Sequence, residues 1–420
     1  MNKLKVLMFG WEFPPFMSGG LGTACYGLTK GLTNKNVQVT FVIPHGPDDM
    51  KAEFVKLLIA SNLSKYNLKI KRVDSLLKPY LSETQYKQDY ERYLETIKLR
   101  TDTNSSATLY GRNIYDEVYR LSMAAKAIAL TEDFDVIHCH DWMTFPAGIE
   151  AKKATGKPLV VQVHATEFDR TGGNSVNQYV YDIERQGMEY ADKVIAVSYF
   201  TKQKIMQHYG IQADKIEVVH NAVDFGNEQK FNIKNHEKVV LFLGRLTLQK
   251  GPDYFIEAAK RVIDYDPDIK FIIAGTGDME ARLVDRAAQL GIGNKVLFAG
   301  FVSGKDVDRM YQMADLYVMP SVSEPFGITP LEALRNNVPV IISKQSGVSE
   351  VLKNALKVDF WDIDELANKI ISVLNYRSLH HELSHHGAME ARSFSWNVPA
   401  QKCVDLYNTL LTNRQKAHVS

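Results

Sequence analysis

Apolar runs of strand length alternate with amphipathic segments along most of the chain. In the first half, strands are predicted at residues 5–9, 37–44, 136–142, 158–164, 190–198 and 216–219. Amphipathic helices are predicted at residues 23–32 and 113–130. Because strands that alternate with helices form parallel sheets covered on both faces, the pattern predicts a doubly wound α/β domain.

A second series of alternations begins at Lys238. Strands are predicted at residues 239–243, 270–274, 296–298, 316–319 and 338–342, and a helix at residues 252–262. After Leu352 only helices are predicted, and the last runs from Trp396 to Leu411 before a polar tail at residues 412–420. Two such series predict two Rossmann-like domains whose strand ends face each other across a cleft.

Two stretches interrupt this alternation. Residues 225–237 are polar and lack apolar periodicity, which predicts a linker. The predicted first domain then spans residues 1–224, the second spans 238–392, and 393–420 form the final helix and tail. Residues 46–112 are rich in Lys, Asp and Tyr and resemble an insertion on the first domain. Its tyrosines could stack on sugars or cover the domain surface.

The composition narrows the class of protein. The 420 residues favour two domains, and the net charge of +1 favours neither a nucleic-acid nor an anionic-membrane partner. Cys25, Cys139 and Cys403 lack CxxC spacing, which favours neither zinc nor a disulfide framework. No apolar run reaches the length of a membrane span, and the first is too short for a signal peptide. We expect a soluble cytoplasmic protein, and the sequence leaves its oligomeric state open.

A turn with several polar residues follows the predicted strand at residues 316–319. Glu324 and Glu332 bracket this turn, with seven residues between them. Gly327 lets a ligand approach the backbone, and Thr329 followed by Pro330 predicts the N-cap and first residue of a helix. The alternative is structural, because Thr329 and Glu332 also fit a capping box and Glu324 fits an ordinary loop acid.

Further polar groups follow the other strands of the second domain. Arg245 and Lys250 together suit a pyrophosphate, because a guanidinium fork and an ammonium group bind its oxygens. Each of them alone fits a solvated surface charge. Four glycines follow neighbouring strands, namely Gly275, Gly277, Gly300 and Gly327. The combination favours an anionic ligand that carries a sugar.

The first domain offers two more candidates. Gly19, Gly20 and Gly22 stand between a strand and a helix, which is the layout of a phosphate-binding turn. Cys25 occupies the third glycine position of a dinucleotide fingerprint, so that motif is incomplete, and a tight turn is the alternative. His164 ends a strand, where loops often hold functional groups, although a structural histidine is the commoner case.

Together, these motifs resemble those of a known family. Gly244-Arg245-Leu246-x-x-x-Lys250-Gly251, Ala274-Gly275-x-Gly277 and Glu324-Pro325-Phe326-Gly327-Ile328-x-x-Leu331-Glu332-Ala333 are similar to stretches of the retaining glycosyltransferases of the GT-B fold, families 4 and 5. Trp11-Glu12-Phe13-Pro14-Pro15 and Gly19-Gly20-Leu21-Gly22 agree, and His140-Asp141-Trp142 resembles the glycogen and starch synthase branch. The resemblance covers nearly the whole chain apart from residues 46–112.

The resemblance implies roles for the candidate residues. Arg245 and Lys250 would hold the donor diphosphate, Glu324 the sugar hydroxyls and Glu332 the ribose, and His164 would lie near the reacting centre. Glu324, His164, Arg245 and Lys250 would form the catalytic set. The other donor-binding residues would be Gly19, Gly20, Leu21, Val302, Phe326, Gly327 and Ile328. Asp141 and Asn221 would line the cleft on the acceptor side, and the last helix would cross back onto the first domain.

The resemblance also implies a reaction. Glucose would pass from UDP-glucose or ADP-glucose to the non-reducing end of an α-1,4-glucan, with retention and without a metal or other cofactor. Met17 stands where glucan synthases typically have lysine, and Phe326-Gly327-Ile328 replaces their Cys-Gly-Leu, which favours UDP- or GDP-sugars. The alternative enzyme acts on a lipid-linked or small acceptor in cell-surface polysaccharide or glycolipid assembly. A non-catalytic sensor is disfavoured by the complete residue set, and a phosphorylase by the short chain.

Overall fold

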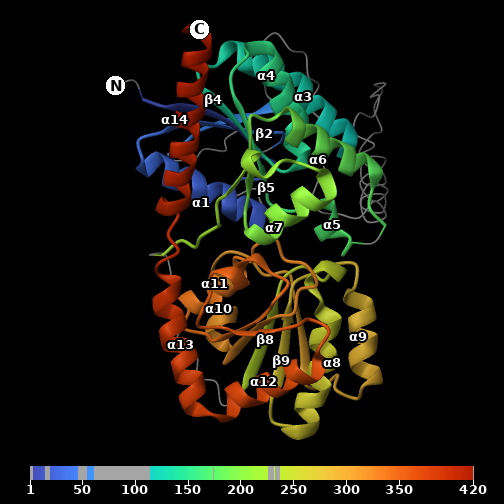
Figure 1. The fold of residues 1–420 in the computed structure, drawn as a ribbon. Helices are drawn as coiled ribbons and strands as arrows, with labels where there is room; N and C mark the ends of the chain where they lie inside the picture. The colour runs from blue at the N-terminus through green and yellow to red at the C-terminus, as the bar shows by residue number, and fades with distance from the viewer. Residues whose placement is uncertain are drawn as a thin grey trace, which may run out of the picture.

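The structure, a computed structural model, describes residues 3–14, 19–45, 54–60, 114–173, 175–225, 231 and 237–419. Most of the predicted insertion and linker, together with Met17, lies outside these residues. The described chain forms two α/β domains, one above the other in Figure 1, with the loops at their strand ends meeting between them. The predicted fold of two parallel sheets is therefore confirmed.

The first domain is built on a seven-stranded sheet with the order β3-β2-β1-β4-β5-β6-β7. Its strands are β1 (Lys5–Phe9), β2 (Gln38–Ile43), β3 (Lys56–Ile59), β4 (Val136–His140), β5 (Leu159–Val163), β6 (Lys193–Ala196) and β7 (Ile216–Val218). All adjacent strands pair in parallel. The order reverses between β1 and β4, which is where open sheets of this kind bind ligands.

One strand of this sheet lies inside the segment that was predicted to be an insertion. β3 pairs with β2 from Thr40–Lys56 to Ile43–Ile59. The prediction was wrong for residues 56–59, because Leu58 and Ile59 are buried and extend the core sheet. A four-residue strand with three apolar residues was too weak a periodic signal to show this.

The second domain is built on a six-stranded parallel sheet with the order β10-β9-β8-β11-β12-β13. Its strands are β8 (Val239–Leu243), β9 (Lys270–Ala274), β10 (Val296–Gly300), β11 (Leu316–Met319), β12 (Val340–Ser343) and β13 (Leu356–Val358). The expectation that only helices follow Leu352 was wrong, since β13 pairs with β12. A strand of three residues is too short to show a period.

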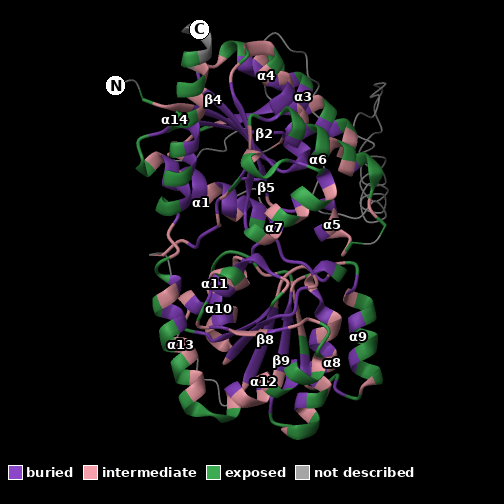
Figure 2. Ribbon diagram, viewed as in Figure 1, coloured by how far each residue is buried: buried purple, intermediate pink, exposed green. Residues whose placement is uncertain are grey.

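Helices cover both faces of each sheet, and buried residues concentrate on the strands between them, as Figure 2 shows. The longer helices before the last two are α1 (Gly20–Asn34), α3 (Ile114–Thr131), α4 (Phe145–Thr155), α6 (Gln178–Tyr190), α8 (Pro252–Tyr265), α9 (Glu280–Gln289), α10 (Lys305–Met313) and α12 (Ile363–Asn375). In β8, Val240 and Phe242 enter one core while Val239 and Leu241 enter the other. This two-sided burial explains why the strands are apolar throughout.

Short helical segments follow several strands at the junction of the domains. They are η2 (Trp142–Thr144), α5 (Glu167–Arg170), α7 (Tyr199–Lys204), its continuation η3 (Ile205–Tyr209), η5 (Leu248–Lys250), α11 (Thr329–Arg335) and η6 (Gly347–Glu350), whereas η4 (Ala213–Lys215) directly precedes β7. Such strand-end segments are where ligand-binding groups are usually placed.

The chain returns to the first domain at its end. α13 (Arg377–Ala391) lies beside the second domain, and α14 (Asn397–Val419) runs up beside the first, as the red helix of Figure 1 shows. Cys403 and Tyr407 of α14 are fully buried in the first core. The predicted crossover helix is thus confirmed. The predicted end at Leu411 was wrong, because the helix continues to Val419.

Candidate active site

The two domains meet through the turn that contains Glu324. The carbonyl oxygen of Pro325 accepts hydrogen bonds from Ser198 Oγ at 2.6 Å and Thr201 Oγ1 at 3.2 Å, and both donors belong to the start of α7 in the first domain. Within its own domain, the second, the turn is held by Gly347 N–H, which donates to Glu324 O at 2.9 Å. The candidate donor site therefore lies at the junction itself.

Glu324 and Lys250 form a direct ion pair, with 2.5 Å between Lys250 Nζ and Glu324 Oε2. Ser321 Oγ also donates to Glu324 Oε2, at 3.3 Å. The Glu324 side chain is 9% exposed and that of Lys250 is 21% exposed, so both sit in poorly hydrated surroundings. A carboxylate can accept from sugar hydroxyls and an ammonium can bind phosphate oxygens, so the pair offers both halves of a nucleotide-sugar site.

The backbone of the turn follows from Gly327. Its φ of 101° is a conformation that side chains rarely adopt, and an added Cβ would lie 3.2 Å from Glu324 Cγ and from Met319. Phe326 next to it is buried, with its ring 5.9 Å from that of His220. Ile328, which was also predicted to bind the donor, is half-buried.

Arg245 lies on the loop after β8, half-buried, and its Nη2 donates to Gln249 Oε1 at 3.5 Å. The glycines of the neighbouring loop pack against the same backbone. A Cβ on Gly275 would lie 1.9 Å from Gly244 O, and one on Gly277 would lie 2.3 Å from Leu246 O. These two glycines are therefore required by the packing of adjacent strand ends, whatever else they contact.

Glu332 does not take part in a capping box. α11 begins at Thr329 with Ile328 as its N-cap, and no side chain caps it, so the prediction of Thr329 as N-cap was wrong. The reason is local competition, since Thr329 Oγ1 accepts from Tyr317 OH at 2.8 Å and Glu332 Oε2 accepts from Tyr311 OH at 3.1 Å. Burial raises the pKa of Glu332, and Arg335 and the Tyr311 hydroxyl oppose that rise.

In the first domain, Asp141 positions the chain at His164. Asp141 Oδ1 accepts from the backbone N–H of His164 at 2.7 Å and of Ala165 at 3.3 Å. Asp141 has a φ of 62° and is only 1% exposed. Its carboxylate is thus directed to the backbone under His164, and it does not line an open cleft as predicted.

His164 itself is half-buried and lies beside a second histidine. Its Nε2 is 3.0 Å from Nδ1 of His140, the last residue of β4. Burial lowers the pKa of His164, and the Asp141 carboxylate acts in the opposite direction. A neutral imidazole at this position can donate or accept one hydrogen bond to a sugar hydroxyl.

The glycine-rich stretch opens α1 and does not precede it. α1 starts at Gly20, after Gly19 in extended conformation, three residues before the predicted start at Thr23. Buried Glu12 explains the early start, since its Oε2 accepts from Gly22 N–H at 3.2 Å at the helix N-terminus. Leu21 is buried in the first core, so its side chain is not available to a donor.

The remaining two predicted residues lie at strand ends. Val302, after β10, is half-buried, and Asn221, after β7, is buried. A separate pocket lies between α8, α9 and the start of α12, and none of the predicted site residues lines it.

Sequence reasoning missed the residues that join the domains. Lys204 Nζ lies 2.7 Å from both Asp169 Oδ1 and Ser323 Oγ, and Ser323 Oγ donates to Asp169 Oδ1 at 2.6 Å. Burial would raise the pKa of the Asp169 carboxyl, but Lys204 and the Ser323 hydroxyl outweigh it and lower that pKa. Ser323 directly precedes Glu324, so this cluster ties the candidate catalytic turn to the first domain.

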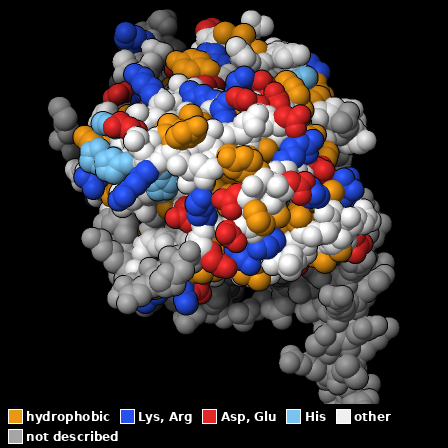
Figure 3. Space-filling model, turned by 90° about the horizontal axis from the view of Figure 1, so that it is seen from below, with side chains coloured by type: hydrophobic (Ala, Val, Ile, Leu, Met, Phe, Trp, Pro, Cys, Tyr) orange, Lys and Arg blue, Asp and Glu red, His pale blue; other side chains and the backbone are white. Residues whose placement is uncertain are grey.

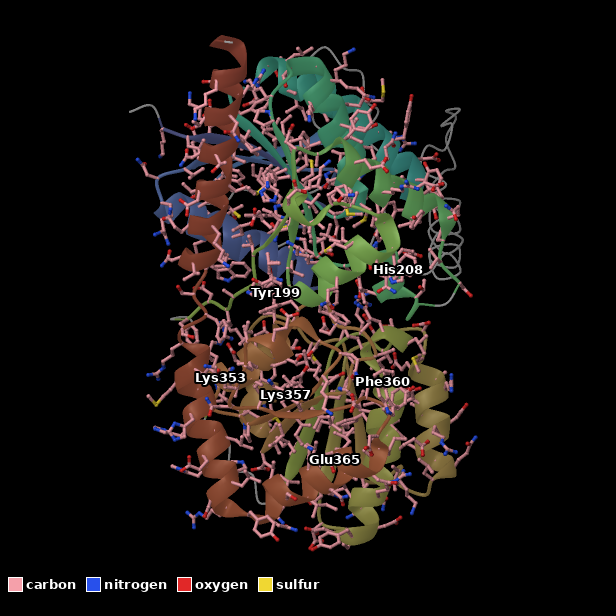
Figure 4. All side chains as sticks on the ribbon, in the orientation of Figure 1. Tyr199, His208, Lys353, Lys357, Phe360 and Glu365 are labelled. Atoms are coloured by element: carbon pink, nitrogen blue, oxygen red, sulfur yellow. The ribbon has the colours of Figure 1, made fainter. Side chains whose placement is uncertain are left out.

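A second cross-domain contact caps α7. Glu350 accepts from the backbone N–H of Tyr199 at 3.0 Å and of Phe200 at 2.5 Å. Figure 4 labels Tyr199 on the first domain and Lys353 and Lys357 on the second, on opposite sides of the junction. The sequence contains one local sign of this helix start, the spacing Ser198-x-x-Thr201, which fits an N-cap. Ser198 Oγ accepts from Thr201 N–H at 2.9 Å.

The fold and the junction define a class. Two facing Rossmann-like domains with an acid–lysine pair between them are those of a GT-B glycosyltransferase. Residues 18–226 match the description Glycosyltransferase Family 4, and residues 225–389 match Glycosyl transferases group 1. An uncharacterized glycosyltransferase of Methanocaldococcus jannaschii is 30% identical over 425 residues, covering 96% of this chain and 98% of the relative. The chain belongs to this glycosyltransferase family, family 4 in its first half and group 1 in its second.

More distant relatives have named activities. Glycogen synthase of Mycobacterium tuberculosis is 24% identical over 84% of this chain and 80% of its own length. D-inositol 3-phosphate glycosyltransferase of Rhodococcus jostii is 26% identical over 68% of each chain. The structure of sucrose-phosphate synthase from Thermosynechococcus elongatus superposes with a TM-score of 0.76 at 18% identity, covering 98% of this chain and 100% of that one. At 18% identity, this similarity shows a shared fold only. Among the described residues, no helix is long and apolar enough to cross a membrane.

Proposed function

We propose that this glycosyltransferase is a retaining, metal-independent enzyme that transfers glucose from UDP-glucose or ADP-glucose to the non-reducing end of an α-1,4-glucan. The observation on which the proposal rests is the Lys250–Glu324 ion pair at the domain junction. The glucan acceptor is supported by the similarity to a glycogen synthase over 84% of the chain. We place the reaction in the cytoplasm, since the three cysteines are free thiols.

In this proposal each residue binds a different part of the donor. Lys250 and Arg245 bind the diphosphate, Glu324 binds the glucose hydroxyls, and Glu332 binds the ribose. Gly19 and Gly20 at the start of α1 approach the phosphates, and the backbone at Val302 approaches the base. Because Lys250 is already paired with Glu324, both groups are held in position before the donor arrives, which reduces the entropy lost on binding.

The chemical step is leaving-group departure with attack on the same face. The bond between the anomeric carbon and the diphosphate breaks, and an acceptor hydroxyl forms the new bond from the side that the diphosphate leaves. The hydroxyl proton passes to the departing phosphate oxygen. Arg245 and Lys250 stabilise the charge that develops on the diphosphate, and the junction residues keep the site dry.

A donor panel tests the proposal. The purified protein is incubated with UDP-, ADP- or GDP-glucose, with and without glycogen, and the released nucleotide diphosphate is measured. We expect release that depends on glycogen, together with growth of α-1,4 chains of retained configuration. Release that is indifferent to glycogen would reject the glucan acceptor while keeping the transferase activity.

The second candidate is transfer to a small or lipid-linked acceptor. The similarity to a D-inositol 3-phosphate glycosyltransferase over 68% of the chain favours a small phosphorylated acceptor in particular. The same panel with inositol phosphate in place of glycogen separates the two candidates. Stimulation by inositol phosphate alone would make this second candidate the function.

A further inference from the structure

Three side chains from separate segments converge in the first domain, and one of them is the candidate catalytic His164. Cys25 of α1, His140 of β4 and His164 after β5 each offer one ligand atom, and these atoms all lie within 4.8 Å of one another. Cys25 and His140 are fully buried, while His164 is half-buried. The cluster brings a thiol and two imidazoles, which are the groups that bind zinc in proteins.

The charge around the cluster also favours a cation. Two buried carboxylates lie beside it, since Glu12 accepts from the N–H of Gly22, three residues before Cys25, and Asp141 accepts from the backbone N–H of His164. A positive ion would complement both acids.

We propose that Cys25, His140 and His164 form a binding site for a thiophilic divalent cation such as Zn²⁺, and that the bound ion inhibits glycosyl transfer. Sulfur and imidazole nitrogen together select zinc-like ions over magnesium or calcium, which prefer oxygen. Binding converts the Cys25 thiol to a thiolate and releases its proton to solvent. The inhibitory effect rests on the proposed function, because it depends on His164 serving the sugar site.

The geometry needs little adjustment. His140 Nδ1 and His164 Nε2 are 3.0 Å apart, and two nitrogens bound to one tetrahedral zinc are about 3.3 Å apart. The ion would replace the proton that these nitrogens now share, and that proton would move to the opposite nitrogen of its own ring, so both imidazoles stay neutral. It would reach the cluster from the side of His164, the member of the three with some exposure, and this histidine would then be unavailable to the sugar.

Cobalt absorption spectroscopy tests the site independently of activity. Co²⁺ added to the full chain should give a near-ultraviolet thiolate-to-cobalt band that saturates near one equivalent and disappears when Zn²⁺ is added. Cys25→Ser should abolish the band, and Cys25→Ala serves if the serine variant melts early. Cys403→Ala is the matched control, because Cys403 is equally buried but lies on α14, and it should keep the band.

Surface histidines on α13 call for a second control. The rings of His381 and His385 stack 5.8 Å apart on the exposed side of this helix, and such a pair can also bind metals. Histidines gather at the left edge of Figure 3, the side on which α13 lies in Figure 1. His385→Gln should leave the thiolate band unchanged. A band that survives in Cys25→Ser, or no band in the native protein, would overturn the site.

Inhibition is tested with the donor and acceptor that support turnover. Zn²⁺ should inhibit transfer reversibly, with recovery on adding a chelator. Cys25→Ser should retain turnover and raise the half-inhibitory Zn²⁺ concentration by about 100-fold or more, because Cys25 is a direct ligand and loss of a supporting group alone costs about 10–100-fold. A thiolate band without inhibition would uphold the site but overturn its effect on transfer. If no donor is turned over, the band still decides the site, so the failures are distinguishable.

Discussion

Lys250 Nζ contacts Glu324 Oε2 at 2.5 Å, although 74 residues separate them along the chain. The two residues proposed to bind the diphosphate and the glucose of a nucleotide-sugar donor are thus joined before any donor is bound. This contact lies at the carboxyl ends of the adjacent strands β8 and β11. The loop with Lys250 and the turn with Glu324, which are separate in the sequence, therefore form one site at the position where open α/β sheets bind ligands.

Removing either member of this pair is expected to abolish transfer. Lys250→Ala and Glu324→Ala should each lower kcat/KM by about 10²–10³-fold or more, the effect of losing one preorganised electrostatic group. Each leaves a partly buried partner uncompensated, so the unfolding free energy should fall by about 1–3 kcal/mol without loss of the fold. Steady-state kinetics and denaturant melts measure the two effects.

Lys260→Ala is the matched control for these variants. Lys260 is also a lysine of the second domain paired with an acid, Asp264, at 2.5 Å, but the pair lies on the surface of α8. It should keep normal turnover and change stability by less than about 0.5 kcal/mol. Turnover close to normal in Glu324→Ala or Lys250→Ala would remove the role assigned to that residue.

Sequence reasoning located the strands of the site because each is a short apolar run that ends in polar residues. It identified β8, β9 and β11 with their observed bounds, and Glu324, Arg245 and Lys250 follow them. It misjudged residues whose partners are distant in sequence. Thr329 fits a capping box locally, but Tyr317 supplies its hydrogen bond. Such partners depend on tertiary packing, which spacing does not record.

The same limit explains the functional groups that were missed. Asp169, Lys204 and Ser323 come from both domains and have no motif in common. Cys25 was set aside because the cysteines lack paired spacing, yet its ligand atom lies within 4.8 Å of those of two histidines. Metal-like clusters assembled from separate strands leave no spacing signal, because their order in the sequence follows topology and not chemistry.

The Asp169–Ser323 contact predicts a positioning residue at the junction. Ser323→Ala removes the hydroxyl that bonds Asp169 and Lys204, and hydrogen bonds to charged groups contribute about 1.5–3 kcal/mol. We expect donor binding to weaken by about 10–100-fold, because the contact that joins the two domains beside Glu324 is lost. Calorimetry of nucleotide-sugar binding measures it.

Ser372→Ala controls for the loss of a serine hydroxyl. Its Oγ donates to the backbone oxygen of Asn368 on the exposed side of α12, away from the junction. Donor affinity should be unchanged there. If Ser323→Ala also binds donor with native affinity, the Asp169–Lys204–Ser323 cluster is structural only and does not position the catalytic turn.

Glu184 is expected to make stability depend on pH. Burial raises its pKa to about 7, against the opposing effects of Arg170, Tyr209 and the Glu167 N–H. In the unfolded chain the same group titrates near 4.5, so the folded state binds more protons between these values. The contribution of Glu184 to the unfolding free energy should therefore fall as pH rises from 4.5 to 7, by up to about 3 kcal/mol.

Urea denaturation between pH 4.5 and 8 tests this expectation. The difference in unfolding free energy between the native protein and Glu184→Gln should fall over this range, since the amide does not titrate, whereas the difference between the native protein and Glu189→Gln should stay constant. Glu189 is a suitable control because it lies on the same helix, paired with Arg185 in an exposed position. Parallel curves for native protein and Glu184→Gln would mean that Arg170 keeps Glu184 ionised throughout.

α14 and the residue before it pack so closely on α1 that one added methyl group on α1 is expected to destabilise the protein. A Cβ on Gly27 of α1 would lie 2.1 Å from Trp396 Cε2, and one on Gly31 would lie 2.5 Å from Trp396 O. Gly27→Ala therefore forces Trp396 and the start of α14 away from the first domain, at a cost of about 1–3 kcal/mol of unfolding free energy. Alanine otherwise favours a helix over glycine by about 1 kcal/mol, so a loss of stability isolates the steric effect.

Gly293→Ala serves as the control, because nothing lies within 4 Å of an added Cβ at that position. Its stability should stay within about 0.5 kcal/mol of the native value. The fluorescence of Trp396 should also shift to longer wavelength in Gly27→Ala, since this residue is only 7% exposed in the native fold. If Gly27→Ala is as stable as the native protein, α14 is not held against α1 by this close approach, and the crossover depends on Cys403 and Tyr407 further along the helix.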